Sequence, residues 1–377
     1  MNNKWITILI IIVLVSAGGS ALYFVDRSPA VDENIGIEPS GTEISIVDER
    51  GRNELLLSNI LSGGVPKDGI PPIDKPQYIS MKEAEELLRQ NDRVFVVESA
   101  EGVKIFPQNI LVWHEIVNDV IDGQNVSITY CPLTGSAIGY NCHLSETPTT
   151  LGVSGKLLNS NLVMYDRESD TYWPQILGEG INNKFADRVL ETFPVYWTTW
   201  EKASQKYDNA LVLSRTTGYI RDYEKDPYGD YKNPSSRSYY SSEGLMFPIM
   251  NVNNELNNKK VVVGIKGDDG VAALDPLYVR KKKVVNLVVG FDPVVAIYDE
   301  TLDAVRVYKR VLNGEMIEFN MVNNKLVDNM HNYEWNVNGQ VVSEPNIGQR
   351  LETLTSFDVM WFAWYAFYPE TELIMGD

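Results

Sequence analysis

The sequence has few of the residues that enzymes most often use for metal or nucleophilic chemistry. Its 377 residues include two cysteines and three histidines, and 33 Lys and Arg stand against 51 Asp and Glu. The net charge of -18 argues against nucleic acid as a partner, because phosphate binding needs clustered cations. No HExxH, GxSxG, glycine-rich phosphate loop or dinucleotide fingerprint occurs, so the sequence gives no support for those enzyme classes.

One stretch is apolar over a length that suits a membrane span. The run from Trp5 to Val25 carries no charge, and about 20 apolar residues cross a bilayer. Lys4 precedes the run and acidic residues follow it, which predicts that the body lies outside the cytoplasm. We therefore predict a single-pass anchor in the cell membrane over residues 1–25 and a polar linker over 26–43. The alternative is a cleaved signal peptide and a secreted protein, with the small residues 16–21 at the cleavage site.

The rest of the chain predicts an α+β, mostly β fold. Short apolar runs bounded by turn residues predict strands, and Ser80 with Glu83 has the spacing of a helix capping box. Helices are expected over 109–120, 195–206 and 358–367, and a long surface loop over Arg221 to Tyr240. Strands are expected over 94–97, 103–106, 125–131, 136–140, 162–165, 210–213, 261–265, 284–289, 294–298 and 304–308.

Matching residues in the two halves of the chain predict an internal duplication. Three residues of the first half recur with the same spacing in the second, namely Asp166, Trp173 and Arg188 as Asp328, Trp335 and Arg350. We expect an N-terminal half over 44–250 and a degenerate C-terminal half over 251–377, forming one compact body or two packed subdomains. The best local match sets Cys131 against Gly290 and leaves the second half without the helix that carries His114. Any chemistry should then lie in the first half.

The scarce residue types gather between residues 113 and 143. On a helix, His114 and Asn118 share one face, and Glu115 and Asp119 share another. Such a face holds a metal through imidazole or orients a general base through a carboxylate. We take as catalytic candidates His114, Glu115, Asp119, Cys131 and Arg167, the last because it does not recur in the second half. The metal candidates are His114, Cys131 and His143, a set that suits copper or zinc better than magnesium or calcium.

Each candidate also has a structural interpretation. His114 suits a polar helix whose imidazole bonds a neighbouring carbonyl group. Cys131 is a reactive thiol or ligand, an inert core residue, or one half of a disulfide with Cys142. In a tight hairpin Cys131 faces about Ser136, roughly 20 Å from Cys142, whereas a disulfide needs α-carbons within about 7 Å. A disulfide therefore requires the chain to double back.

Four stretches resemble a widespread family of secreted or membrane-anchored bacterial and archaeal proteins, domain-of-unknown-function family 3179. They are GGVPKDGIPPIDKPQY, VWHEIVND, ITYCPLTGSA and LGVSGKLLNSNLVMYDRESDTYWPQ, and the resemblance covers roughly residues 55 to 377. It implies an extracytoplasmic setting and a signature centred on His114, Glu115, Asn118, Asp119 and Cys131, but no established activity. Many members of this family have a second cysteine where this chain has Thr134, which argues here against a paired-cysteine site.

Two functional hypotheses follow, and the sequence does not decide whether the protein is an enzyme. The first is a metal- or thiol-dependent protein, redox or hydrolytic, with its site at His114, Glu115 and Cys131. The second is a non-catalytic cell-surface binding or structural module. That module would bind a partner through aromatic and tyrosine-rich loops such as Arg221 to Tyr240.

Overall fold

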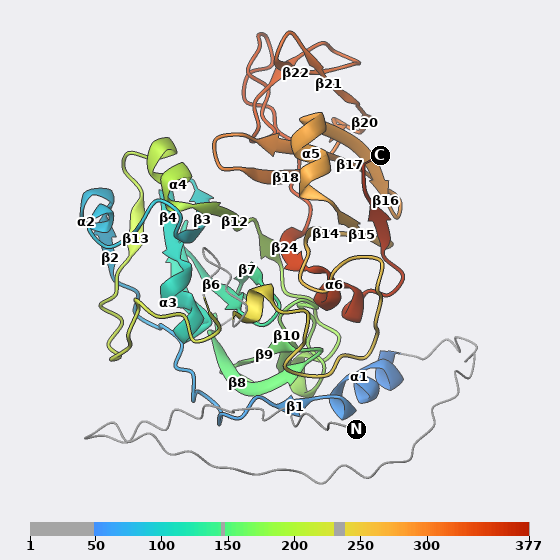
Figure 1. Cartoon of the computed structure of the whole chain (residues 1–377). Helices are drawn as coiled ribbons and strands as arrows, with labels where there is room; N and C mark the ends of the chain where they lie inside the picture. The colour runs from blue at the N-terminus through green and yellow to red at the C-terminus, as the bar shows by residue number, and fades with distance from the viewer. Residues whose placement is uncertain (1–48, 145–147, 230–237, 377) are drawn as a thin grey trace, which may run out of the picture.

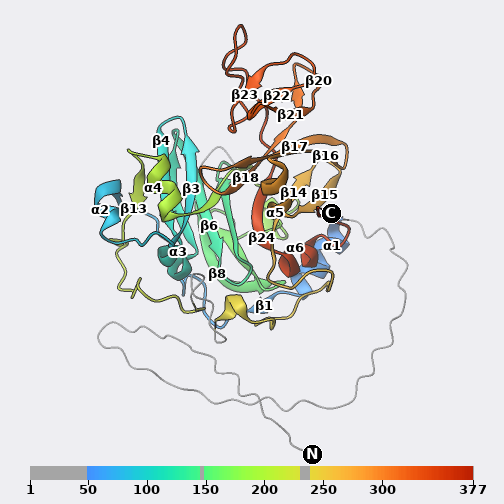
Figure 2. The same cartoon turned by 45° about the horizontal axis from the view of Figure 1, so that its top comes forward.

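The computed structural model describes residues 49–144, 148–229 and 238–376 (Figures 1 and 2). The predicted anchor, the linker and the first residues of the N-terminal half lie outside these ranges. Within the described ranges, no helix is both long enough and apolar enough to span a bilayer. Most of the regular structure is strand, arranged in several small sheets with short helices between them, so the α+β, mostly β prediction is confirmed.

Three sheets make up the first half, which begins with helix α1 (Glu49–Ser58). The first has the order β12 (Tyr196–Thr199), β3 (Arg93–Ser99), β4 (Gly102–Pro107), β13 (Leu211–Leu213), β2 (Tyr78–Ser80). The second has the order β11 (Thr192–Phe193), β7 (Ser136–Asn141), β6 (Gln124–Cys131), β5 (Ile116–Ile121). The third has the order β1 (Leu61–Ser62), β8 (Leu151–Leu158), β9 (Asn161–Asp166), β10 (Tyr172–Pro174).

The described part of the second half contains four sheets. Its first sheet has the order β24 (Ser356–Met360), β14 (Val261–Gly267), β15 (Gly270–Leu274), β25 (Glu372–Ile374). The next has the order β16 (Val284–Val289), β17 (Asp292–Asp299), β18 (Ala304–Lys309). Two small sheets follow, one of β19 (Val311–Leu312) and β20 (Glu315–Met316), the other of β21 (Phe319–Val322), β22 (Lys325–Asp328) and β23 (Glu334–Trp335).

The two halves share an order of elements. In each, an antiparallel hairpin (β3–β4 or β14–β15) leads into a seven-residue helix and then into a three-stranded meander. The helices are α3 (Gln108–His114) and α5 (Pro276–Lys282). A late strand pairs antiparallel with the hairpin on one side and another pairs parallel on the other side. The duplication that would explain this order stays a prediction.

The recurring Asp and Trp residues build the same turn in both halves. Asp166 accepts hydrogen bonds from three backbone N–H groups just after it and from the indole of Trp173, at 2.7–3.1 Å. Asp328 accepts the equivalent backbone bonds and one from the indole of Trp335 at 2.9 Å. Their spacing is therefore required by the fold.

The structure corrects the alignment of the two halves. The second half has a helix, α5, where α3 carries His114, and Lys282 takes the place of His114 at its end. Cys131 is the last residue of β6, and its counterpart is Asp299 at the end of β17, not Gly290. Gly290 instead lies in the turn before β17. The sequence match failed because it set β6, the second strand of the first-half meander, against β16, which is the first strand of the second-half meander.

Three predicted helices are shorter than expected. The helix over 109–120 ends at His114, and residues 116–121 form β5. The helices over 195–206 and 358–367 each begin as a strand, β12 or β24, before α4 (Trp200–Lys206) or α6 (Trp361–Phe367). The residues of β12 and β24 pair with strands that are distant in sequence, and those of β5 pair with the next strand, β6; helical periodicity reveals neither kind of pairing. The capping box at Ser80 is confirmed, at the start of α2 (Met81–Glu85).

A buried ion cluster joins the two halves. Arg306 of β18, 1% exposed, donates to Glu98 of the first half at 2.7 and 3.0 Å and to Asp299 at 2.9 Å. Lys206 of α4 also contacts Asp299, at 2.9 Å. Burial alone would raise the pKa of Asp299, but the charge of Arg306 and the other donors offset it and hold the pKa at about 2. The carboxylate therefore stays ionised at neutral pH.

Substituting Arg306→Met should destabilise the protein strongly, because it leaves Asp299 and Glu98 without their guanidinium partner. Removing one member of a buried ion pair costs about 3–5 kcal/mol. Urea unfolding of the variant measures this loss of unfolding free energy. The matched control is Lys325→Ala, which breaks the exposed Lys325–Glu334 pair and should cost less than about 1 kcal/mol. Losses of similar small size in both variants would contradict the role assigned to Arg306.

Candidate functional site

The candidate site forms where α3 turns sharply into β5. Glu115 adopts left-handed backbone angles, with φ 58°, and its N–H donates to the carbonyl of Leu111 at 2.7 Å. Its own carbonyl accepts from the N–H of Tyr130 at 2.7 Å, which fixes the turn against the end of β6. This places Glu115 beside Cys131. Lys283 makes the same turn in the second half, with φ 70°.

His114 is fully buried, and both of its ring nitrogens are occupied. Nδ1 lies 2.8 Å from the carbonyl oxygen of Pro71, which only accepts, so Nδ1 carries the proton. Nε2 then accepts from the Tyr223 hydroxyl at 2.8 Å, and that oxygen lies 2.6 Å from the hydroxyl of Thr217. Burial lowers the pKa of His114 to about 4, so the imidazole is neutral at pH 7. Its role here is to tie α3 to two distant loops.

Glu115 differs from His114 in its hydrogen bonding. Its side chain is 7% exposed and accepts no hydrogen bond from any residue in the described ranges. Burial raises the pKa of Glu115 to about 8, because it removes most of the water that would stabilise the charged form. The carboxyl group is therefore mostly protonated at neutral pH. A buried carboxyl group without a partner is costly, and perturbed groups of this kind are concentrated at functional sites.

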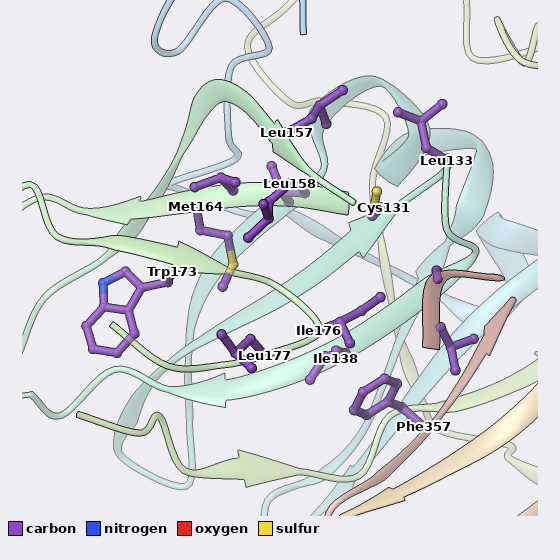
Figure 3. Close-up of a cluster of buried hydrophobic side chains, with 14 of the residues drawn as sticks. Cys131, Leu133, Ile138, Leu157, Leu158, Met164, Trp173, Ile176, Leu177 and Phe357 are labelled. Atoms are coloured by element: carbon purple, nitrogen blue, oxygen red, sulfur yellow. The ribbon is translucent and has the colours of Figure 1, made fainter. Parts of the chain in front are cut away.

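Cys131 directly follows Tyr130, whose N–H binds the Glu115 carbonyl, and it belongs to the largest buried cluster, which includes Leu133 and Leu158 (Figure 3). Cys131 is 1% exposed, and its Sγ lies 3.9 Å from the carbonyl oxygen of Ser160. Burial raises the pKa of the thiol to about 11, and the charge of Glu115 adds to the rise. Burial also raises the pKa of Tyr228, and Glu115 and Cys131 contribute to it. These three groups therefore share one buried environment.

Two of the other catalytic candidates make their hydrogen bonds and ion pairs away from Cys131. Asp119 accepts from the Tyr78 hydroxyl at 2.5 Å and from Lys104 at 2.6 Å. Arg167 is exposed and pairs with Asp74 at 2.8 Å. Neither interaction involves the buried group around Cys131. The structure thus brings together Glu115 and Cys131 and leaves Asp119 and Arg167 in separate ion pairs.

The predicted metal ligands are not assembled either. His143 is exposed, whereas His114 and Cys131 are buried. Across residues 49–144, 148–229 and 238–376, no three His, Cys, Asp or Glu side chains are grouped closely enough to hold a metal ion. The geometry therefore gives no support to the predicted copper or zinc site at these three residues.

The remaining signature residue, Asn118, serves the fold. Its side-chain amide donates to the carbonyl of Leu151 at 2.9 Å and accepts from the Leu151 N–H at 3.1 Å. Asn286, at the equivalent position of β16, makes the same pair of bonds to Phe319. Because both halves use this amide clamp, Asn118 holds β5 to β8 and is not specific to the site.

Both cysteines are free thiols in the structure. Cys131 pairs with Ser136 across the β6–β7 hairpin, as the sequence predicted. Cys142 lies 3.1 Å from the hydroxyl of Ser127, and burial raises its pKa to about 11. Of the three interpretations of Cys131, the disulfide is not formed here.

Sequence analysis missed the residues that enclose the site. Tyr223 and Tyr239 come from the segment that we predicted as a surface loop, yet they are 6% and 5% exposed. Tyr239 donates to the carbonyl of Leu133 at 2.7 Å and so closes the loop that follows Cys131. The high tyrosine content of this segment was the only sign in the sequence of a contact with the site. It did not show whether the rings face the protein interior or the solvent.

The Glu115→Gln variant should remove a pH dependence of stability. The folded pKa of about 8 lies above the ordinary value of 4.5, so the folded state holds the extra proton. Stability is then fully present below pH 4.5 and is lost as pH rises toward 8, by at most about 1.4 kcal/mol per pH unit. Urea unfolding between pH 5 and 8 should show a growing advantage of the variant over the wild type.

His114 provides the internal control. Its folded pKa of about 4 lies below the ordinary 6.5, so its contribution to stability is present above pH 6.5 and is lost as pH falls toward 4. The two slopes oppose each other between about pH 4.5 and 6.5, and the slope of Glu115 stands alone above that window. If the stability difference between Glu115→Gln and the wild type stays constant from pH 6.5 to 8, the carboxyl group is not perturbed as described.

Comparison with known proteins gives one match. No curated protein and no solved structure matches this chain. A sequence model of a family described as "Protein of unknown function (DUF3179)" matches residues 67–371, which include every residue of the turn and hairpin around Glu115 and Cys131. Because the match covers most of the chain, the protein belongs to the DUF3179 family.

Proposed function

We propose that this is an extracytoplasmic, membrane-anchored protein whose functional group is the Cys131 thiol, controlled by the carboxyl group of Glu115. The observation that carries the proposal is the buried residue Glu115, whose carboxyl group has no hydrogen-bond partner among the described residues and whose backbone carbonyl is bound by Tyr130, the residue before Cys131. The proposal replaces the imidazole–thiol pair expected from the sequence with a carboxyl–thiol pair. His114 then positions the turn and takes no part in proton transfer.

The pair is suited to thiol-dependent chemistry. At neutral pH both groups hold their protons, so the thiol is stored in its unreactive form. Once Glu115 ionises, its carboxylate is a base within the same buried environment and can take the proton of Cys131. The resulting thiolate is a nucleophile and a soft ligand. Substrate access requires movement of covering residues such as Leu133 and Tyr239, which are joined by a hydrogen bond.

Titration of the thiol tests this proposal. In a Cys142→Ser background, Cys131 is the only thiol, and its ultraviolet thiolate absorbance should appear near pH 11. Adding Glu115→Gln removes a neighbouring negative charge and should lower this pKa, by roughly half a unit to one unit for one nearby charge. Circular dichroism recorded at each pH restricts the comparison to folded protein.

The matched control uses the other cysteine. In a Cys131→Ser background, Cys142 is the remaining thiol, and Glu115 is not among the groups that shift its pKa. Its titration should be the same with and without Glu115→Gln. A Cys131 titration that is unchanged by Glu115→Gln would refute the coupling, and equal shifts at both thiols would show a general effect of the substitution.

The anchor is a separate part of the proposal. It is supported by the uncharged run over residues 5–25 with Lys4 before it and acidic residues after it. The full-length protein should stay in the membrane fraction after alkaline carbonate washing, and its mass should include residues 1–25. A mature N-terminus just after residues 16–21, with the protein in the medium, would instead establish a cleaved signal peptide.

A non-catalytic surface module is the second candidate, and one observation favours it. The second half exposes large apolar side chains, with Phe291 81%, Met316 57% and Val288 50% exposed. Exposed apolar groups of this kind mark contact surfaces when they form a patch. The tyrosines of 221–240 are less suited to that role than the sequence suggested, because Tyr223 and Tyr239 are buried.

A further inference from the structure

The two halves meet at two equivalent junctions. At the first junction, β12 of the N-terminal half packs against β18, and the Thr198 hydroxyl donates to the carbonyl of Leu302 at 2.5 Å. At the second junction, β24 of the C-terminal half packs against β7, and the N–H of Met360 donates to the carbonyl of Thr134 at 2.9 Å. Because the halves share an order of elements, each position at one junction has a counterpart at the other.

The first junction is filled by an arginine. Arg306, the third residue of β18, reaches across to Glu98 and lies over the ring of Tyr196 at 4.1 Å. Its side chain is almost fully buried. The cation comes from one half and its carboxylate from the other, and no space remains between them for a ligand.

At the second junction a lysine takes the place of the glutamate, and a shorter, uncharged side chain takes the place of the arginine. Ile138, the third residue of β7, occupies the place of Arg306, and Phe357 occupies that of Tyr196. Lys266, next to last in β14, occupies the place of Glu98, next to last in β3. A cavity of about 270 Å³ lies at this junction, lined in part by Lys266 and Phe357. A smaller hollow of about 40 Å³ lies beside it and includes Ile138.

The ammonium group of Lys266 has more hydrogen-bond donors than acceptors around it in the described part of the chain. Its Nζ donates to the carbonyl of Leu177 at 2.8 Å, and the nearest carboxylate, Glu179, is 3.9 Å away and is bound by Arg52 at 2.5 Å. An ammonium group has three donors, so two of those of Lys266 have no hydrogen-bond acceptor in the described part of the chain. The side chain is 20% exposed, and burial lowers its pKa despite the charge of Glu179.

The other charged groups that line the cavity do not compete for this role. Lys309 is held by Asp268 at 3.1 Å and by Asp292 at 2.9 Å. Glu352 is exposed. The hydroxyls of Thr192 and Thr355, which also line the cavity, lie 2.8 Å apart.

We propose that this cavity binds a small organic carboxylate, with its oxygens on Lys266 and its apolar part against Phe357. The carboxylate would supply at the second junction the ion pair that Arg306 and Glu98 make at the first, with the signs reversed. One ammonium group without a guanidinium fork suits a monoanion better than phosphate. The volume is close to the lower limit of small-molecule sites, which matches a ligand of a few carbon atoms.

Binding of butyrate to the full-length protein in detergent micelles tests the proposal. Saturation-transfer NMR should show saturable butyrate binding, whereas butyramide, which has the same shape without the charge, should bind far more weakly. Lys266→Met should weaken butyrate binding about tenfold or more, because it removes a charge-assisted hydrogen bond. Lys266→Arg should retain binding. Lys156→Met, the same change at a partly buried lysine of β8, should leave it unchanged.

A second measurement needs no variant. Acetic anhydride labels lysine amines, and butyrate should slow the acetylation of Lys266, but not that of Lys156, in the wild-type protein. Equal binding of butyrate and butyramide, or an unprotected Lys266, would overturn the proposal, and tighter binding of inorganic phosphate would overturn the assignment to carboxylates. Cys131→Ser should bind butyrate normally, which separates this site from the proposed thiol function.

Discussion

The position of the two halves relative to each other depends on the guanidinium of Arg306, which lies between the carboxylates of Glu98 and Asp299. A charge taken out of water is tolerated only when its partners surround it with good geometry. Arg306 and Asp299 come from the second half and Glu98 from the first, so this requirement holds the two together. The turn at Glu115 lies in the same half of the chain as Glu98.

The two halves use one backbone frame to produce opposite electrostatic environments. At the end of β17, Asp299 is surrounded by cations, and its pKa falls to about 2 although burial acts to raise it. At the equivalent end of β6 is Cys131. No cation among the described residues lowers the pKa of its neighbour Glu115, and burial raises that pKa to about 8. The depth of burial is similar in the two places. What differs is whether a cation lies against the carboxyl group. With cations beside it, Asp299 is ionised at neutral pH, and without one in the described part of the chain, Glu115 keeps its proton.

The sequence predicted features that local chemistry determines. The strands of the β3–β4 and β6–β7 hairpins, the capping box at Ser80 and the pairing of Cys131 with Ser136 follow from patterns a few residues long. The helix over 109–120 was wrong because β5 pairs with β6, and this pairing overrides the helical spacing that continues past the turn. The partners of His114 lie in segments far along the chain, so no local pattern could show that its nitrogens were already occupied.

The order of deprotonation determines what the Glu115–Cys131 pair can bind. With both protons present the pair is neutral, which suits its apolar surroundings. The first proton leaves near pH 8 and the second near pH 11, since the first negative charge opposes the second. A ligand that brings positive charge or an electrophilic centre would lower both values and favour its own binding, whereas an anion would raise them. The cavity at Lys266 has the reverse preference, because its unused donors belong to a cation. The two proposed sites thus have opposite charge selectivity, one within the first half and one between the halves.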